Sequence, residues 1–176
     1  LGKPVLVLGA GGHAKVLIDA LKQSSSTILG ITDPDSSLWG QSLMGVPMLG
    51  NDETILEYSP QEVLLVNALG SVSSTKARAT LYETWKAKGY SFATVIHRRA
   101  ILAPEVQLAE GVQVLAGVII NTGTVIGENT IINTASVIEH DGVIGKHVHI
   151  AGARIAGQVN IGNFCHVGIG STIIQN

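Results

Sequence analysis

The sequence predicts a small Rossmann-like parallel α/β domain over residues 1–95, followed by a left-handed parallel β-helix of hexapeptide repeats over residues 96–176. Three observations lead to this fold class: a change of composition near residue 95, a six-residue aliphatic period after it, and alternating strand and helix patterns before it. Six of the seven aromatic residues precede residue 96, whereas five of the six histidines follow it. A narrow interior that cannot admit aromatic rings would explain why the second part relies on Val, Ile, Leu and Ala.

The six-residue period is the strongest signal in the second part. Aliphatic residues stand at ten consecutive positions six apart, and the period resumes after one five-residue step. These positions are Ile96, Leu102, Leu108, Val114, Ile120, Ile126, Ile132, Ile138, Ile144 and Ile150, followed by Ile155, Ile161, Val167 and Ile173. A period of six fits neither an α-helix nor an alternating strand, and it is typical of a parallel β-helix in which three hexapeptides form one coil. A β-sandwich with accidental periodicity is the alternative.

The end of such a solenoid is an exposed sheet edge, which natural repeat proteins cover with a cap. No helix or polar cap is recognisable before Asn176. We therefore expect the natural protein to continue beyond this residue.

Residues 1–95 alternate between strand-like and helix-like segments. Strands are predicted at Val5–Gly9, Thr27–Thr32, Val63–Asn67 and Ser91–Ile96, the last of which leads into the first coil. Helices are predicted at Ala14–Gln23, with Val16, Leu17, Ala20 and Leu21 facing inward, and at Thr75–Lys88, with Ala77, Leu81 and Trp85 facing inward. Strands that alternate with helices favour a parallel sheet with right-handed crossovers.

A glycine-rich turn at residues 9–14 links the first strand to the first helix. Its sequence, Gly-Ala-Gly-Gly-His-Ala, fits the G-x-G-x-x-G/A pattern, and Asp33 follows the second strand. Gly9, Gly11 and Gly12 would let the backbone approach a diphosphate at a helix N-terminus. His13 could donate a hydrogen bond to a phosphate or a sugar, and Asp33 could reach a ribose or a base. A dinucleotide site and a turn without a ligand are alternatives, but so short a domain suits a mononucleotide such as a UDP-sugar.

Composition and charge exclude several classes of partner. The formal net charge is −2, whereas proteins that bind nucleic acids or anionic membranes carry a basic excess. No apolar run approaches the roughly 18 residues that a membrane span needs. A single cysteine rules out an internal disulfide framework and favours a reducing compartment. We expect a cytoplasmic protein that neither inserts into membranes nor binds nucleic acid.

The motifs of the two parts occur together in one known family. The glycine turn extends to Gly-Ala-Gly-Gly-His-Ala-Lys-Val at residues 9–16, and the repeats contain Ile-Asn-Thr-Ala-Ser-Val-Ile-Glu-His-Asp at residues 132–141. With segments 69–72, 89–97 and 143–150, the whole chain resembles the NeuD family of bacterial sugar O-/N-acyltransferases. That family includes UDP-4-amino-sugar N-acetyltransferases of the bacillosamine pathway and sialic acid O-acetyltransferases. The resemblance implies acetyl-CoA as co-substrate, a nucleotide-linked amino sugar as acceptor, and a homotrimer with acetyl-CoA bound between subunits.

The resemblance also implies a catalytic pair, His140 and Asp141. His140 is the only histidine in the chain that an acidic residue follows. Histidine changes charge near neutral pH and suits a general base, and a neighbouring carboxylate can fix its tautomer. Adjacent residues of a strand point to opposite faces, however. Asp141 would therefore point away from His140 unless the chain turns a corner there.

Coil arithmetic adds a third residue to this pair. One coil beyond His140, after allowance for the five-residue step, lies Gly157, and its backbone N–H is a candidate donor to the oxyanion of the reaction. The resemblance also places a glycine amide near this point. Ile155 and His149 are further predicted acetyl-CoA contacts, and His149 matches the family's acetyl-CoA-contacting histidine. Because His149 lies half a coil from His140, we expect it to complete the site of a neighbouring subunit.

The resemblance places the acceptor beside Asn133 and Thr134, which match polar positions that line the acceptor cleft. The residues alone leave the acceptor atom open, so a sialic acid or other sugar O-acetyltransferase stays an alternative to N-acetylation.

Alternative functions would depend on other residues of the chain. His147, His149 and His166 could hold zinc between subunits, as in a β-helix carbonic anhydrase, although we predict no metal site. Cys165 is more typical of a core or interface position than of a nucleophile. A Rossmann oxidoreductase would bind NAD, and a non-catalytic scaffold would bind a nucleotide sugar without releasing CoA.

Overall fold

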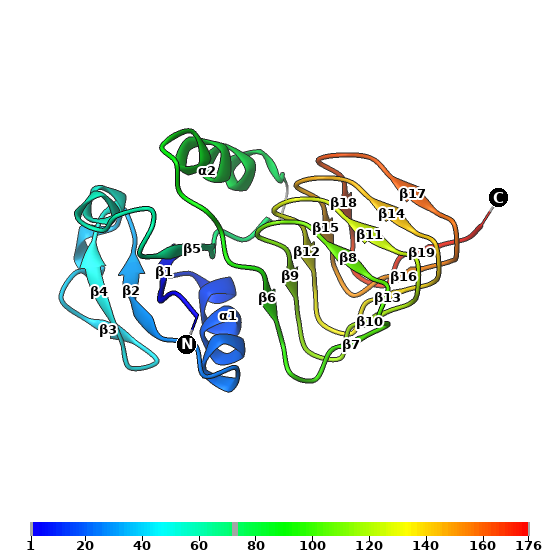
Figure 1. The fold of residues 1–176 in the computed structure, drawn as a ribbon, viewed down its shortest axis with the longest axis horizontal. Coiled ribbons are helices and arrows are strands. Elements are labelled where there is room, and N and C mark those ends of the chain that lie inside the picture. The colour runs from blue at the N-terminus through cyan, green and yellow to red at the C-terminus, as the bar shows by residue number, and fades with distance from the viewer. Residues whose placement is uncertain (1, 72–73, 176) are drawn as a thin grey trace.

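The computed structural model describes residues 2–71 and 74–175. Leu1, Asn176 and Val72, the last residue of the predicted segment 69–72, lie outside this part. A five-stranded sheet with its helices occupies one end of the molecule and a three-sided parallel β-helix occupies the other (Figure 1). The predicted fold class is therefore confirmed. Neither described helix is long and apolar enough to cross a membrane.

The sheet of the first part has the strand order β3-β4-β2-β1-β5. Its strands are β1 (Val5–Leu8), β2 (Ile28–Thr32), β3 (Ser42–Leu43), β4 (Val46–Gly50) and β5 (Leu64–Asn67). Strands β1, β2, β4 and β5 run parallel, as the alternating pattern predicts. The antiparallel hairpin of β3 and β4 is not predicted, because Met44 and Gly45 form its turn with positive φ angles in place of the usual Asn-Gly.

Helix α1 spans Gly12–Gln23 and helix α2 spans Lys76–Ala87, with short 3₁₀ helices at Ser36–Leu38 and Asp52–Glu57. The predicted inward faces are partly wrong. On α2 the buried residues are Arg78, Ala79, Tyr82 and Trp85, whereas Ala77 is exposed and Leu81 is half-buried. Helix α2 packs against the β-helix as well as its own sheet, and this second surface rotates its buried face. On α1, Val16 is exposed and Ile18 is buried instead.

The β-helix consists of two-residue strands separated by short corners. They are β6 (Val95–Ile96), β7 (Ile101–Leu102), β8 (Gln107–Leu108), β9 (Gln113–Val114), β10 (Ile119–Ile120), β11 (Val125–Ile126), β12 (Ile131–Ile132), β13 (Val137–Ile138), β14 (Val143–Ile144), β15 (His149–Ile150), β16 (Arg154–Ile155), β17 (Asn160–Ile161), β18 (His166–Val167) and β19 (Thr172–Ile173). The second residue of each strand belongs to the aliphatic series found in the sequence. Of the strand predicted at Ser91–Ile96, only Val95–Ile96 is a strand, and Phe92 forms a single bridge to Leu65.

The three sheets of the β-helix show how the coils stack. Their orders are β19-β16-β13-β10-β7, β17-β14-β11-β8 and β18-β15-β12-β9-β6. Ile138 pairs with Ile120 on one side and with Ile155 on the other. One coil therefore has eighteen residues and the next seventeen, so the five-residue step shortens a corner and leaves the stack of aliphatic side chains unbroken.

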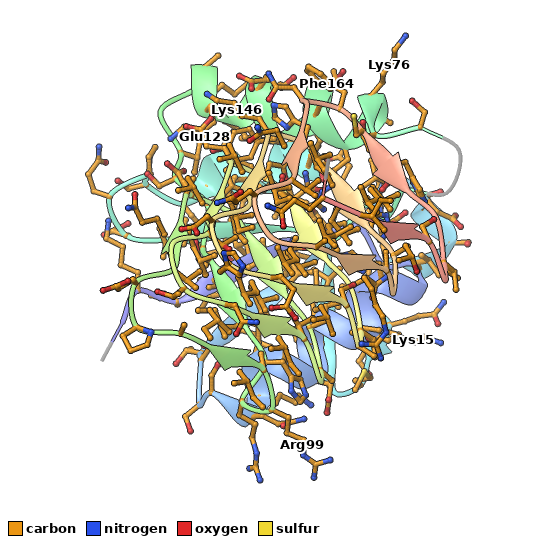
Figure 2. All side chains as sticks on the ribbon, turned by 90° about the vertical axis from the view of Figure 1, so that its right-hand side faces the viewer. Lys15, Lys76, Arg99, Glu128, Lys146 and Phe164 are labelled. Atoms are coloured by element: carbon orange, nitrogen blue, oxygen red, sulfur yellow. The ribbon has the colours of Figure 1, made fainter. Side chains whose placement is uncertain are left out.

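The two parts share a core. Leu115 and Ile131 of the β-helix pack in one hydrophobic cluster with Leu17 and Ile18 of α1. At the other side of the junction, Glu110 accepts hydrogen bonds from the Lys86 ammonium and from the backbone N–H of Phe92. Charged side chains such as Lys15, Lys76 and Arg99 project away from this junction at the rim of the molecule (Figure 2).

Candidate active site

His140 and Asp141 occupy a corner between β13 and β14. Asp141 has a φ of 56°, so the chain turns sharply there and does not continue as a strand. The His140 Nδ1 and the Asp141 Oδ2 are 2.9 Å apart. Because a carboxylate only accepts, Nδ1 carries the proton and Nε2 carries the free lone pair. The alternation of a strand would have separated these side chains, and the corner joins them.

Two glycines from neighbouring coils flank the pair. A Cβ added to Gly157 would lie 2.6 Å from His140 Nε2, and one added to Gly123 would overlap the Asp141 carboxylate. Gly123 also has a φ of +72°, which side chains disfavour. The predicted position of Gly157 one coil beyond His140 agrees with this packing. Only glycine at both positions lets the imidazole and the carboxylate lie flat against the coils.

The backbone N–H of Gly157 is a free donor beside His140. The neighbouring Ala156 and Gln158 amides donate to Ile173 O and His140 O, each at 2.9 Å. Within the described residues the Gly157 amide donates to no backbone or side-chain acceptor. Gly157 packs against the His140 ring, so its unpaired N–H is a candidate donor to a developing oxyanion at this corner.

The glycine turn lines a separate cleft of about 640 Å³. Its walls are the turn, Asp33, the segment 68–71 that follows β5, and Asn133 and His149 from the β-helix. Gly9 has a φ of +99°, and α1 starts after the N-cap residue Gly11 with no side-chain cap hydrogen bond and no acidic residue in its first turn. The free N–H groups of this helix start make the wall suited to an anion.

Asp33 has a structural task besides any ligand contact. Its carboxylate accepts the Ala10 N–H at 2.8 Å and the Asp35 N–H at 3.0 Å. These bonds hold the glycine turn against the end of β2. A carboxylate has about four acceptor sites, so Asp33 can still accept a hydroxyl.

His13 uses one of its ring nitrogens in a hydrogen bond within the protein, so Nε2–H is not free to donate to a phosphate or a sugar as predicted. Its Nε2 lies 2.7 Å from Gln113 Oε1, and the Gln113 amide nitrogen donates to Asn67 O, so the histidine is the donor. Burial, with a further contribution from the positive charge of Arg78, lowers the pKa of His13 to about 4. The ring is therefore neutral at pH 7, and its Nδ1 is an acceptor.

His149 is held on both ring nitrogens. Its Nδ1 lies 2.7 Å from Ser71 Oγ and 3.0 Å from Ser71 O, and the Asn133 amide nitrogen lies 3.1 Å from its Nε2. Asn133 Oδ1 accepts the Thr134 N–H, which orients the amide so that it donates to His149. Burial lowers the pKa of His149 to about 4; the hydrogen bond to the Ser71 carbonyl opposes this shift, and the charges of His166 and Arg78 add smaller contributions to it.

Two predicted contacts are placed differently. The Ile155 side chain is 1% exposed and packs inside the coil, so it cannot touch acetyl-CoA, and its carbonyl already accepts the Glu139 N–H. Thr134 is exposed and lies outside the cleft that Asn133 lines. The repeat itself indicates that Ile155 points inward, because this residue belongs to the aliphatic series, whereas the repeat does not give the direction of an outer residue such as Thr134.

Comparison with known proteins places this geometry in a family. A family model described as the PglD N-terminal domain matches residues 4–84. A histidine-to-alanine mutant of GDP-perosamine N-acetyltransferase from Caulobacter crescentus, solved with CoA and GDP-perosamine, is 30% identical, with 98% of this chain and 89% of that chain covered and a TM-score of 0.85. The chain belongs to the NeuD family of sugar acyltransferases. Accordingly it is an enzyme, a sugar N- or O-acetyltransferase.

Two further structures share this NeuD-family fold. The acetyltransferase domain of PglB from Neisseria gonorrhoeae, in complex with acetyl coenzyme A, is 26% identical over 98% of this chain and 93% of that chain, with a TM-score of 0.82. WeeI from Acinetobacter baumannii is 20% identical over 97% and 93% of the two chains, with a TM-score of 0.71, and shows the fold alone.

In this NeuD-family chain the predicted residues form two groups. Asn133 and His149 join the glycine turn in one cleft, whereas His140, Asp141 and Gly157 lie at a corner outside it. His147 shares no face with His149, since its ring bonds Asn129 and Glu83 instead. The described residues contain no group of three side chains placed to hold a metal ion.

Sequence reasoning missed Ser71, Gln113 and Arg78. Ser71 bonds His149, Gln113 bonds His13, and Arg78 carries charge close to both rings. Gln113 was visible as a polar residue beside an aliphatic repeat position. Nothing local marks Ser71 or Arg78, because their partners lie in distant segments.

Proposed function

We propose that this acyltransferase moves an acetyl group from acetyl-CoA to the amino group of a nucleotide-linked sugar, with a UDP-4-amino sugar as the first candidate. The observation that carries the proposal is the His140–Asp141 hydrogen bond at a corner where Gly157, whose N–H is unpaired, packs against the ring. This corner supplies a general base, its orienting acid and an oxyanion donor within one coil step.

In the proposed mechanism the Asp141 carboxylate accepts a hydrogen bond from Nδ1–H of His140 and thereby keeps the lone pair on Nε2. Nε2 takes a proton from the sugar amine while the amine nitrogen attacks the thioester carbonyl carbon. The Gly157 N–H donates to the resulting oxyanion. When the C–S bond breaks, the protonated His140 returns its proton to the departing sulfur, so CoA leaves as a thiol and the sugar leaves as an amide.

The glycine-turn cleft is the proposed site for the nucleotide sugar. The diphosphate would lie at the start of α1 against Gly9, Gly11 and Gly12, and a free acceptor site of Asp33 would meet a ribose hydroxyl. The neutral Nδ1 of His13 would accept a hydrogen bond from the sugar. The Caulobacter relative is named for GDP-perosamine, so both UDP- and GDP-linked sugars belong in any test.

A homotrimer would join the two groups of residues. Val125 and Val143 are paired neighbours with exposed side chains on one outer face of the β-helix, and such an apolar stripe favours contact between copies. The proposed trimer sets the His140 corner of one copy against the cleft of the next, where His149 contacts acetyl-CoA. A cytoplasmic location would suit the lone cysteine, which is Cys165 and is exposed.

The test measures thiol release from acetyl-CoA with UDP- and GDP-linked 4-amino sugars and with free sialic acid. His140→Ala is compared with Lys146→Ala, which removes an exposed side chain from the next corner of the same coil. Release with a nucleotide sugar that only His140→Ala abolishes is the expected result. Release with sialic acid alone would favour O-acetylation, and sugar binding without any thiol release would favour a scaffold. Light scattering of the same samples measures whether they are trimers.

A further inference from the structure

A buried cation occupies the junction between α2, the segment after β5 and the β-helix. Arg78, on the first turn of α2, is 1% exposed. Among the described residues it forms no ion pair, and its NH2 atom is buried without a hydrogen-bond partner. Burying a guanidinium without a carboxylate is strongly unfavourable, so such a residue calls for an explanation beyond packing.

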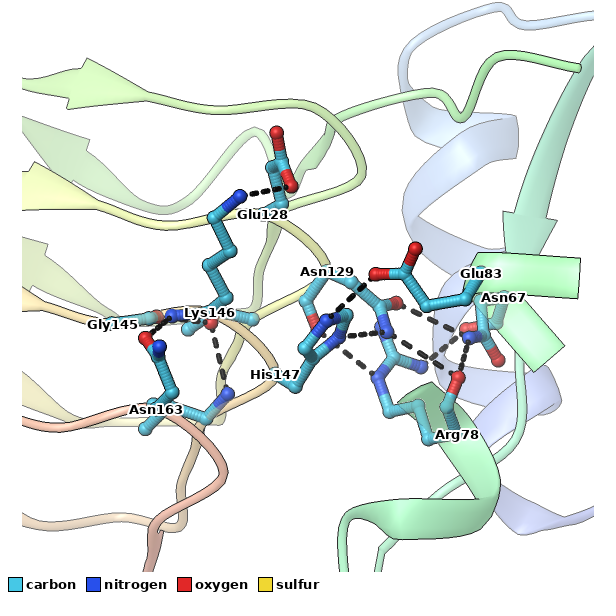
Figure 3. A network of polar contacts seen from close by, with 11 residues as sticks. Asn67, Arg78, Glu83, Glu128, Asn129, Gly145, Lys146, His147 and Asn163 are labelled. Carbon is cyan, nitrogen blue, oxygen red and sulfur yellow. Dashed lines mark hydrogen bonds and ion pairs between the residues drawn. The ribbon is translucent and has the colours of Figure 1, made fainter. Parts of the chain in front are cut away.

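Arg78 binds three backbone carbonyls from two distant segments (Figure 3). Its NH1 atom donates to Asn67 O at 2.6 Å and to Leu69 O at 3.0 Å, and its Nε atom donates to Asn129 O at 3.3 Å. Asn67 ends β5, Leu69 lies two residues further on, and Asn129 is a corner of the β-helix with a φ of 53°. One side chain therefore fixes the segment after β5 to a β-helix corner.

Two asparagines reinforce the same junction. The Asn67 amide nitrogen donates to Arg78 O at 2.9 Å and to Asn129 Oδ1 at 3.2 Å. The Asn129 amide nitrogen in turn reaches His147 Nδ1 at 3.0 Å. The segment after β5 thus cannot shift relative to the β-helix without breaking several buried hydrogen bonds.

The segment that Arg78 holds is a wall of the candidate cleft. Residues 68–71 line it beside the glycine turn, and Ser71 at the end of this segment bonds His149 Nδ1 through both its hydroxyl and its carbonyl. The position of Ser71 sets the ring orientation of His149. The positive charge of Arg78 also disfavours a proton on His149 and on His13.

We propose that Arg78 is a positioning residue for sugar acetyl transfer: it holds the segment 68–71 against the β-helix so that the cleft stays formed and His149 keeps its neutral, Nδ1-protonated tautomer. Only the kinetic test of this inference depends on the proposed function, because the histidine titration needs no acetyl transfer. The other groups that act on His149 are the Ser71 hydroxyl and carbonyl, the Asn133 amide and His166 in the next coil, and none of them is substituted in the variants below.

The variants separate the charge of Arg78 from its geometry. Arg78→Lys keeps a cation but cannot reach three carbonyls with a planar fork, and Arg78→Met keeps the length without the charge. Lys76→Met, which removes an exposed cation from the same helix, is the matched control. Each variant is assayed as the full chain, after circular dichroism and thermal unfolding have established that it is folded.

The first readout needs no activity: histidine ¹³Cε1 resonances are titrated to follow the His149 ring. We expect the His149 pKa to rise in Arg78→Met, because the Arg78 charge is lost and release of the segment 68–71 exposes the buried ring. It should rise less in Arg78→Lys and stay in place in Lys76→Met. The second readout is kinetic. Both Arg78 variants should raise the KM for the nucleotide sugar about tenfold, the factor for one lost charged hydrogen bond, with a smaller change in kcat.

These results distinguish the two proposals. A wild-type chain that releases no thiol while Arg78→Met still shifts the His149 titration would remove the proposed function and keep the positioning role. Folded Arg78 variants with an unchanged His149 titration and an unchanged KM would overturn the positioning role. If Arg78→Met does not fold, Arg78→Lys and Lys76→Met carry the same comparison.

Discussion

The packing of Gly157 against His140 allows one substitution to test the catalytic corner. In Gly157→Ala the new methyl group would lie 2.6 Å from His140 Nε2, 2.8 Å from Cε1 and 3.1 Å from Cδ2. Non-bonded heavy atoms prefer about 3.5–4.0 Å, so the ring must move by roughly 1 Å. His140 can make this move into solvent, because its side chain is 50% exposed.

The expected effect is large for catalysis and small for stability. A misplacement of about 1 Å at a reacting group can reduce a rate about 100-fold, so kcat should fall by that order. The free energy of unfolding should fall by only about 1 kcal/mol, which is the scale of one off-rotamer side chain. The Asp141 hydrogen bond at 2.9 Å should also weaken, since it requires the present ring position.

The assay is steady-state thiol release from acetyl-CoA with the best acceptor, together with thermal unfolding. Gly162→Ala is the control, because a Cβ at Gly162 meets nothing within 4 Å and its φ is not in the glycine region. It should keep wild-type kcat. A folded Gly157→Ala enzyme with wild-type kcat would show that the His140 ring position is not tied to the reaction.

Three further expectations follow from the same contacts. Asp141→Asn should lower kcat about 100-fold with little change in KM, because the imidazolium loses its counter-charge; an unchanged kcat would remove Asp141 from the mechanism. Gly123→Ala should lower kcat and melting temperature together, since its methyl overlaps the Asp141 carboxylate at a φ of +72°, and a silent variant would contradict this geometry. His13 and His149 have pKa values of about 4 in the folded chain, against 6.5 in the unfolded chain. As the pH falls below 6.5, the unfolded chain therefore binds protons before the folded chain does. The free energy of unfolding should be highest above pH 6.5 and should fall towards pH 4 by on the order of 2 kcal/mol per ring. Urea unfolding between pH 7 and pH 4.5 measures this slope, which His149→Asn should flatten.

Much of the β-helix is readable from the sequence because its information is local. The aliphatic position of each hexapeptide is the inward position of a coil, and counting residues predicts the place of Gly157 beside His140. The family resemblance added the roles of these residues. A corner such as the one at Asp141 is harder to predict, since a non-glycine residue adopts φ of 56° there without a sequence signal.

The junction between the two parts could not be predicted. The buried face of α2 is set by two surfaces at once, so a helical period based on Ala77, Leu81 and Trp85 selects the wrong side. His13 faces Gln113, which is one hundred residues away in the chain. Such pairings depend on how two independently recognisable units dock, and neither the turn motif nor the repeat contains that information.

The seventeen-residue coil between Ile138 and Ile155 shows how a periodic protein can make one position unlike the others. Before the five-residue step from Ile150 to Ile155, equivalent corner positions lie multiples of six residues apart. The step shifts the numbering of all later corners by one, while the stacked core continues. A deletion is thereby confined to the outside of the solenoid. The deletion changes which residue stands above His140 and leaves the surrounding fold intact. In this architecture the residues that face one another at a corner can therefore change by single-residue insertion or deletion, and not only by substitution.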